Sequence, residues 1–231
     1  MRFYRSAIEV LEKAKLEFLV GGAFALHAFT GIQRDTKDFD IMVRQRDVDA
    51  VLAAFREVGY PADYAFTHWL AKVHYGEYFI DVIYRAGNGL GEVDDVWFER
   101  SIEADVLGLR LRVCPPEEMI WQKSYIMERE RFDGADVLHL MRACAGKMDW
   151  NHLIRRFGPD WRVLLSHCTL FGFVYPGERL AVPQEVLREL TERLVTETAA
   201  LPEKDSRCCG TLLSRAQYLP DVERWGYDDA R

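Results

Sequence analysis

Two glycines and a nearby pair of carboxylates constrain this chain more than any other feature of its sequence. The apolar segment 18–20 ends in Gly21 and Gly22 and runs directly into a helical pattern. Further on, Asp38 and Asp40 are separated by a single residue. Residues i and i+2 of a strand project from the same face, so the two carboxylates are expected to point together. Such anions repel unless a cation lies between them, and the pattern therefore predicts a metal-dependent site for phosphoryl transfer.

A third carboxylate, Asp81, lies at the centre of an apolar strand predicted over residues 78–84. Residues 70–75 are expected to form its hairpin partner. A charge inside such a strand is unfavourable unless it is paired or binds a metal, so Asp81 is either a ligand or the partner of Lys72 or Arg85. Mg²⁺ prefers carboxylate oxygens, and three converging acids should raise the pKa of at least one of them.

The glycines have a separate predicted role in binding phosphate. At a turn from strand to helix, Gly21 and Gly22 let backbone N–H groups approach a ligand closely. The N-terminus of the helix predicted to follow adds positive potential. Two glycines alone are a weak signal, but together with the ordered carboxylates they indicate a nucleotide site.

This set of residues resembles the nucleotidyltransferase superfamily, whose fold is that of DNA polymerase beta, in its small prokaryotic branches. Members of those branches have Gly-Gly or Gly-Ser, a helix, Asp-x-Asp and a lone Asp on a later strand. The matching residues here are Gly21, Gly22, Asp38, Asp40 and Asp81. Gly22 stands where many members have serine, which removes a hydroxyl that could contact a terminal phosphate.

The run from Arg34 to Asp40 is similar to the Arg-x-Thr-x-Asp-x-Asp form of AbiEii-type nucleotidyltransferases. Two later segments are similar to further motifs of that type, in which a lysine and an aspartate complete the nucleotide site. Lys123 and Asp136 are the matching positions, whereas His139 stands where a second acid is usual. The resemblance covers roughly residues 5–145.

The resemblance implies a nucleotidyltransferase that uses Mg²⁺, with Mn²⁺ as the alternative ion. Its donor would be a nucleoside triphosphate, and its acceptor an RNA end, a protein or a small molecule; no membrane partner is expected. The catalytic and metal-binding residues implied are Asp38, Asp40 and Asp81. The implied nucleotide-binding residues are Gly21, Gly22, Lys123 and Asp136.

Other interpretations stay open at this point. The chain could be an antibiotic-modifying enzyme with the same core, a non-catalytic nucleotide-binding or antitoxin-like module, or an acidic helical adaptor built on its C-terminal half. Asp38 and Asp40 could be solvated residues of a strand edge or turn. Lys123 could be an exposed helix lysine, and Asp136 could pair with Arg129 or Arg131.

Composition narrows the class of protein further. The chain has 231 residues, 49% of them hydrophobic, which is enough for one substantial domain with a helical extension. A net charge of −7 argues against a broad nucleic-acid footprint. The five cysteines lack zinc-site spacing, and with no long apolar run or signal peptide they are expected to be reduced thiols in the cytosol.

The predicted fold class is α/β (α+β), a mixed sheet flanked by helices with a mainly helical C-terminal region. The core is predicted over residues 1–146 and the helical region, packed on it, over 147–231. Strands are expected at 17–20, 38–44, 70–75, 78–84 and 109–113. Helices are expected at 4–15, after Gly22, at 46–58 with Val58 inward, from 116, and at 150–157, 161–170 and 184–199. A polar loop is expected at 201–210, followed by an aromatic tail that packs onto the body.

Overall fold

The computed structural model describes residues 2–201 and 205–231 and divides into two compact units. The units are Met1–Pro115 and Pro116–Arg231. The sequence prediction placed a boundary after residue 146 instead. The observed boundary lies earlier because α5 (Pro116–Ser124) and α6 (Gly134–Cys144) pack against the helices that follow them. No helix in the described part of the chain has the length and apolar character needed to span a membrane.

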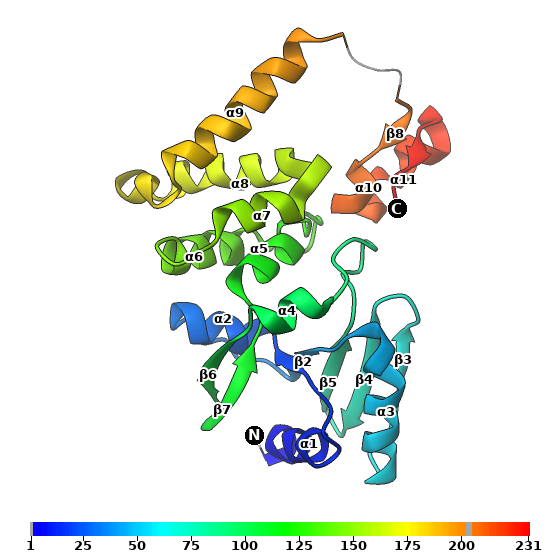
Figure 1. The fold of residues 1–231 in the computed structure, drawn as a ribbon. Coiled ribbons are helices and arrows are strands. Elements are labelled where there is room, and N and C mark those ends of the chain that lie inside the picture. Colours follow the sequence, from blue (N-terminus) through cyan, green and yellow to red (C-terminus); the bar gives the residue numbers. More distant parts are fainter. Residues whose placement is uncertain (1, 202–204) are drawn as a thin grey trace. The chain divides into compact units, whose positions relative to one another are not determined.

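The first unit is built on a seven-stranded mixed sheet (Figure 1). Its strands in chain order are β1 (Leu19–Val20), β2 (Asp38–Met42), β3 (Ala62–Phe66), β4 (Leu70–Tyr75), β5 (Tyr78–Ile83), β6 (Ile102–Val106) and β7 (Leu109–Val113). Their order across the sheet is β3-β4-β5-β2-β1-β7-β6. β2 pairs in parallel with β5, and β1 with β7, while the other pairs are antiparallel. The predicted mixed sheet with flanking helices is confirmed, although β3, β6 and the short helix α4 (Asp95–Glu99) were not expected.

One face of this sheet is covered by α1 (Arg2–Lys13) and α3 (Val48–Glu57). Tyr4 of α1 stacks on Phe39 of β2, with their ring centroids 5.4 Å apart. Phe39 and Ile41 are buried on this side, and strand alternation leaves their polar neighbours on the opposite face. Val58 was expected to point inward, but α3 ends at Glu57 and the Val58 side chain is exposed.

The helix α2 (Gly22–Thr30) begins directly where β1 ends. Gly21 occupies its N-cap position in an extended conformation, and Gly31 ends it in the left-handed conformation, with its N–H donating to the carbonyl of His27. The predicted strand–glycine–helix turn is therefore present, with the start of α2 beside β2.

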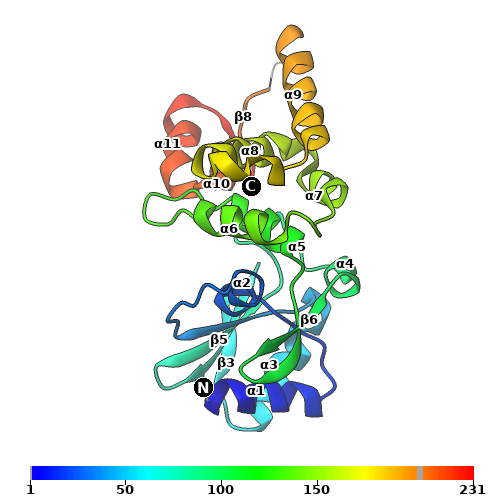
Figure 2. The same ribbon diagram turned by 90° about the vertical axis from the view of Figure 1, so that its left-hand side faces the viewer.

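The second unit is helical (Figure 2). Its remaining elements are the helices α7 (Trp150–Phe157), α8 (Trp161–Val174), α9 (Gln184–Ala199), α10 (Gly210–Leu213) and α11 (Arg215–Trp225) and the paired strands β8 (Arg207–Cys208) and β9 (Asp228–Asp229), with short 3-10 turns between helices. α5 packs against α6, α7 and α8, and α8 packs against α9.

The C-terminal tail matches its prediction in part. The loop expected at 201–210 includes residues 202–204, which lie outside the described residues, and β8 begins within it. Thr211 and Leu212 of α10 are buried, and the Ser214 hydroxyl donates to Glu128, so this part of the tail packs onto the second unit. The Trp225 side chain, by contrast, is 72% exposed.

Candidate active site

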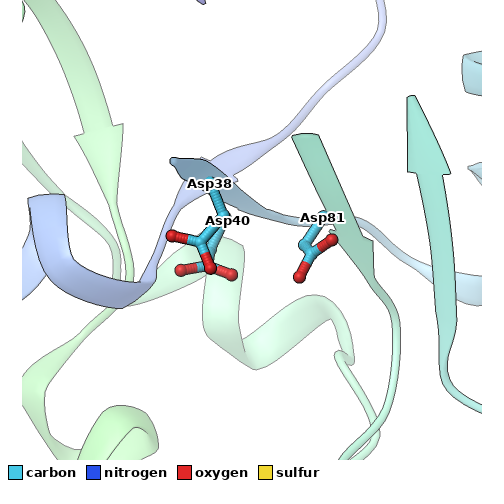
Figure 3. Close-up of side chains that lie close together, drawn as sticks. All are labelled: Asp38, Asp40 and Asp81. Atoms are coloured by element: carbon cyan, nitrogen blue, oxygen red, sulfur yellow. The ribbon is translucent and has the colours of Figure 1, made fainter. Parts of the chain in front are cut away.

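Three carboxylates converge on the face of the sheet opposite α1 and α3. Asp38 and Asp40 project from β2 and Asp81 from the adjacent β5, where Asp40 and Asp81 are register partners (Figure 3). One ligand oxygen from each lies within 4.8 Å of the others, and all three residues are half-buried. Both β2 and β5 lie inside the sheet rather than at its edge. Parallel pairing brings Asp81 beside the Asp-x-Asp pair.

Thr36 restrains the first of these carboxylates. Its hydroxyl donates to Asp38 Oδ1, and it accepts a hydrogen bond of 3.3 Å from the backbone N–H of Asp38. Thr36 is the threonine of the Arg-x-Thr-x-Asp-x-Asp run, so this position of the motif orients the Asp38 carboxylate.

The two glycines are required by their contacts with β2. The Gly21 N–H donates to the Asp40 carbonyl at 2.9 Å, and a Cβ at Gly21 would lie 2.5 Å from Met42 Cε. Gly22 has φ of +52°, and a Cβ there would overlap the Asp40 carboxylate. A serine at residue 22 would require the Asp40 carboxylate to move. The start of α2 therefore lies directly against Asp40.

Asp81 also has a partner of its own. Lys72 of β4 is its register partner, and Lys72 Nζ lies 2.6 Å from Asp81 Oδ1. The alternative partner, Arg85, instead pairs with Glu92 at 3.0 Å. Burial raises the pKa of Asp81 and the nearby Asp38 charge adds to this, although Lys72 opposes the shift. A raised pKa was expected from like charges, but burial is its larger cause.

The donor set of this cluster fits a hard divalent cation. Carboxylate oxygens are the ligands that Mg²⁺ and Mn²⁺ take in proteins, and three of them can share one ion or two. Within residues 2–201 and 205–231, no second group of three acidic, histidine or cysteine side chains comes this close together. Asp38, Asp40 and Asp81 are thus the residues of the described chain best suited to hold such an ion.

Lys123 and Asp136 lie in the second unit, within a buried ion-pair cluster. Lys123 Nζ lies 2.7 Å from Asp133 and 2.8 Å from Asp136, and Arg131 Nε lies 2.8 Å from Asp133. The Lys123 side chain is only 15% exposed, so its interpretation as a solvent-exposed helix lysine is wrong. Asp133 was missed as a member of this cluster. The role of Lys123 and Asp136 in binding nucleotide stays a prediction.

Two arginines near the acidic pair in sequence are engaged in ion pairs. Arg44 Nη1 lies 2.8 Å from Glu17, and its guanidinium lies 3.5 Å from the centroid of the Phe98 ring. Arg46 Nη2 lies 2.7 Å from Asp95. These contacts favour a structural role for both cations over a role in holding phosphate.

Comparison with known proteins gives one family match. The model of the aminoglycoside-2''-adenylyltransferase family matches residues 4–89, which is less than half of the chain but includes both glycines and all three carboxylates. No curated protein matches the sequence.

Solved structures with some likeness include the antibiotic-resistance factor ANT(2'')-Ia, at 16% identity and a TM-score of 0.48, with 71% of this chain and 94% of that chain covered. The lincosamide antibiotic adenylyltransferase LnuA has 17% identity and a TM-score of 0.43, with coverage of 60% and 92%. A nucleotidyltransferase-like structure from Thermotoga maritima has 16% identity and a TM-score of 0.38, with coverage of 49% and 75%. At these values the likeness has no weight in assigning a function. With the family match over residues 4–89 and the mixed sheet that carries the three carboxylates, the first unit has a nucleotidyltransferase-like fold.

Proposed function

We propose that this protein is a metal-dependent nucleotidyltransferase, which transfers a nucleoside monophosphate from a nucleoside triphosphate to an acceptor hydroxyl. The observation that carries the proposal is the convergence of Asp38, Asp40 and Asp81 beside the glycine turn that begins α2. The match of residues 4–89 to an adenylyltransferase family supports it.

In this proposal Asp38 and Asp40 hold the divalent cations, and Asp81 joins them on the acceptor side. When bound, Mg²⁺ supplies positive charge to the phosphates and lowers the pKa of the acceptor hydroxyl. The acceptor oxygen then forms a bond to the α-phosphorus while the bond from that phosphorus to the bridging oxygen breaks, and pyrophosphate leaves. Asp81 is proposed to take the proton of the acceptor, for which its raised pKa is suited.

Backbone and cationic groups are proposed to hold the triphosphate. The N–H groups at Gly21 and Gly22 and the positive end of α2 suit the β- and γ-phosphates. Lys123 is assigned to the negative phosphate charge as a point cation, with Asp136 as its partner in the nucleotide site. Both assignments of the second unit rest on motif similarity to AbiEii-type proteins.

A second candidate concerns the acceptor. The family whose model matches is described as an aminoglycoside-2''-adenylyltransferase, which favours an antibiotic-like small molecule over an RNA end or a protein. A non-catalytic nucleotide-binding or antitoxin-like module is a weaker alternative, since all three carboxylates of the catalytic pattern are present.

The direct test of the proposed function is a labelling experiment. The protein is incubated with Mg²⁺ and each nucleoside triphosphate labelled at its α-phosphate, together with RNA, a cell extract or a panel of antibiotics. We expect label to enter one class of acceptor and pyrophosphate to be released in equal amount. Transfer of a γ-label, or no Mg²⁺-dependent transfer to any of these acceptors, would contradict the proposal.

A further inference from the structure

Lys72 forms an ion pair with one oxygen of Asp81, the third carboxylate of the proposed metal site. Lys72 lies directly across from Asp81 in the antiparallel pair of β4 and β5. The distance of 2.6 Å joins Lys72 Nζ to Asp81 Oδ1, and the two side chains are 24% and 14% exposed. This pair is therefore shielded from water, unlike most ion pairs between a lysine and an acid on a sheet surface.

The Lys72 ammonium is held from a second direction by an aromatic ring. Its Nζ lies 3.9 Å from the centroid of the Phe79 ring, within the range of a cation–π contact. Phe79 is also the register partner of Asp38, so the residue that contacts the lysine lies beside β2 in the sheet. Two contacts from fixed strand positions define where the ammonium lies, which is unusual for a flexible side chain.

An ammonium in this position competes with a metal ion. Both cations seek the carboxylate of Asp81, and the lysine already engages one of its two oxygens. At Asp38 the neighbouring donor is the uncharged hydroxyl of Thr36, which does not repel a cation. Asp38 and Asp81 therefore differ in the charge of the neighbouring donor that a divalent ion would meet.

We infer that Lys72 is a positioning residue of this site, which aims Asp81 and competes with the divalent cation for it. The inference rests on the proposed metal site. Lys72 offsets the negative charge of Asp81 until a divalent cation binds there.

The test uses Mn²⁺ alone, whose free concentration is followed by electron paramagnetic resonance, with no nucleotide and no activity readout. We expect Lys72→Met to bind Mn²⁺ about fivefold more tightly than the wild type, because the competing charge is gone. Lys72→Arg, which keeps the charge, should bind like the wild type. Unchanged or weaker Mn²⁺ binding by a folded Lys72→Met protein would overturn the inference.

Lys37 provides a matched control for the loss of one positive charge. It precedes Asp38 in the chain, but its Nζ pairs with Glu77 at 2.7 Å and its side chain is 68% exposed. Lys37→Met should leave Mn²⁺ affinity close to that of the wild type. An equal gain in affinity in Lys37→Met and Lys72→Met would show that net charge alone is responsible, and this would also overturn the inference.

A second measurement on the wild-type protein covers the case in which Lys72→Met does not fold. The ¹³Cε resonance of Lys72 should shift on saturation with diamagnetic Mg²⁺, while that of Lys37 should not. No shift at Lys72 would contradict competition at Asp81.

The Asp40→Asn variant distinguishes failure of the proposed metal site from failure of the inference about Lys72. If Asp40→Asn binds Mn²⁺ as well as the wild type does, or if neither the wild type nor any variant binds Mn²⁺, the proposed site fails along with the inference. If Asp40→Asn loses Mn²⁺ binding but the Lys72 variants bind Mn²⁺ like the wild type, the inference alone fails.

Discussion

Gly22 shows how one residue fixes the geometry of the proposed site. Its positive φ is unfavourable for residues with a side chain, and the position that a Cβ would take is occupied by the Asp40 carboxylate. Gly31, at the other end of α2, also has positive φ, but a Cβ there would have no neighbour within 4 Å. A side chain at residue 31 would therefore meet backbone strain alone, whereas a side chain at residue 22 would meet both backbone strain and steric overlap.

This comparison predicts the cost of adding a methyl group at each position. Gly31→Ala should lower the free energy of unfolding by about 1–2 kcal/mol through backbone strain. Gly22→Ala should lower it by about 1–3 kcal/mol more, because Asp40 must move. Urea unfolding of both variants measures the difference, and Mn²⁺ binding should weaken in Gly22→Ala alone. Equal destabilisation with intact Mn²⁺ binding in both would show that Asp40 is not constrained by Gly22.

The sequence predicted the local part of the site but not the part that depends on register. Asp38 and Asp40 share a face because side chains alternate along a strand, and their spacing of two residues is enough to predict this. Whether Asp81 pairs with Lys72 or Arg85 depends on how β4 and β5 align, and the sequence left that choice open. The Phe79 contact with Lys72 depends on the same alignment. For this reason no role for Lys72 beyond that of an ion-pair partner could be predicted from the sequence.

At the scale of elements, α5 and the segment that leads into α6 are joined by the cluster around Lys123. The lysine comes from α5, whereas Asp133 and Asp136 come from the N-terminal end of α6. Burial would raise the pKa of Asp133, but the hydrogen bond from Arg131 and the charge of Lys123 outweigh it and lower this pKa to about 2. The cluster therefore links two helices by charge as well as by apolar packing.

Removal of the lysine should therefore weaken the second unit. Lys123→Met leaves Asp133 and Asp136 buried without their shared cation, and we expect the free energy of unfolding to fall by about 3 kcal/mol. If the motif similarity also reflects function, the folded variant should lose affinity for a triphosphate more than for a monophosphate, measured by calorimetry. Unchanged stability with weaker triphosphate binding would assign Lys123 to the nucleotide alone. Equal triphosphate affinity would remove it from the nucleotide site.

The lowered pKa of Asp133 predicts a pH dependence of stability. Its folded-state pKa lies below the ordinary value of 3.8, so its contribution is fully present above that value and is lost as the pH falls through about 2. The wild type should exceed Asp133→Asn in unfolding free energy by on the order of 2 kcal/mol at pH 7 and by less at pH 3. Urea unfolding at both pH values measures this margin.

Asp205 serves as the control for this prediction. Its pKa is also lowered to about 2, by hydrogen bonds from Arg207, but the side chains of Asp205 and Arg207 are 48% and 65% exposed to solvent. Asp205→Asn should therefore change stability much less than Asp133→Asn at pH 7. A margin for Asp133 that is the same at pH 7 and pH 3 would show that its charge does not stabilise the fold.

The elements that the sequence missed have weak patterns of their own. All residues of β3 after Ala62 are exposed, and β6 alternates charged residues with small or apolar ones over only five positions. Both lie at the edges of the sheet, where pairing on one side suffices and few apolar side chains are needed. α4 spans five residues, too few for a helical period to be recognised.

At the scale of the whole molecule, the three carboxylates and both glycines belong to the first compact unit, together with Lys72. The residues of the later motifs belong to the second. The family match ends at residue 89 and so lies entirely within the first unit. The proposed metal site therefore belongs to the first unit alone, and the residues with predicted nucleotide roles, Lys123 and Asp136, belong to the second.

The most direct test of the proposed metal site is the binding of Mn²⁺ to the wild-type protein and to its Asp40→Asn variant, with Asp63→Asn as a control. Asp63 is an exposed acid of β3, whose carboxylate lies 3.7 Å from His74 and outside the cluster of three. We expect Asp40→Asn to lose Mn²⁺ binding and to keep or gain thermal stability, because repulsion among the carboxylates is reduced. Asp63→Asn should bind Mn²⁺ as the wild type does. Unaltered Mn²⁺ affinity in Asp40→Asn, or unfolding of that variant, would contradict the claim that these carboxylates form a metal site.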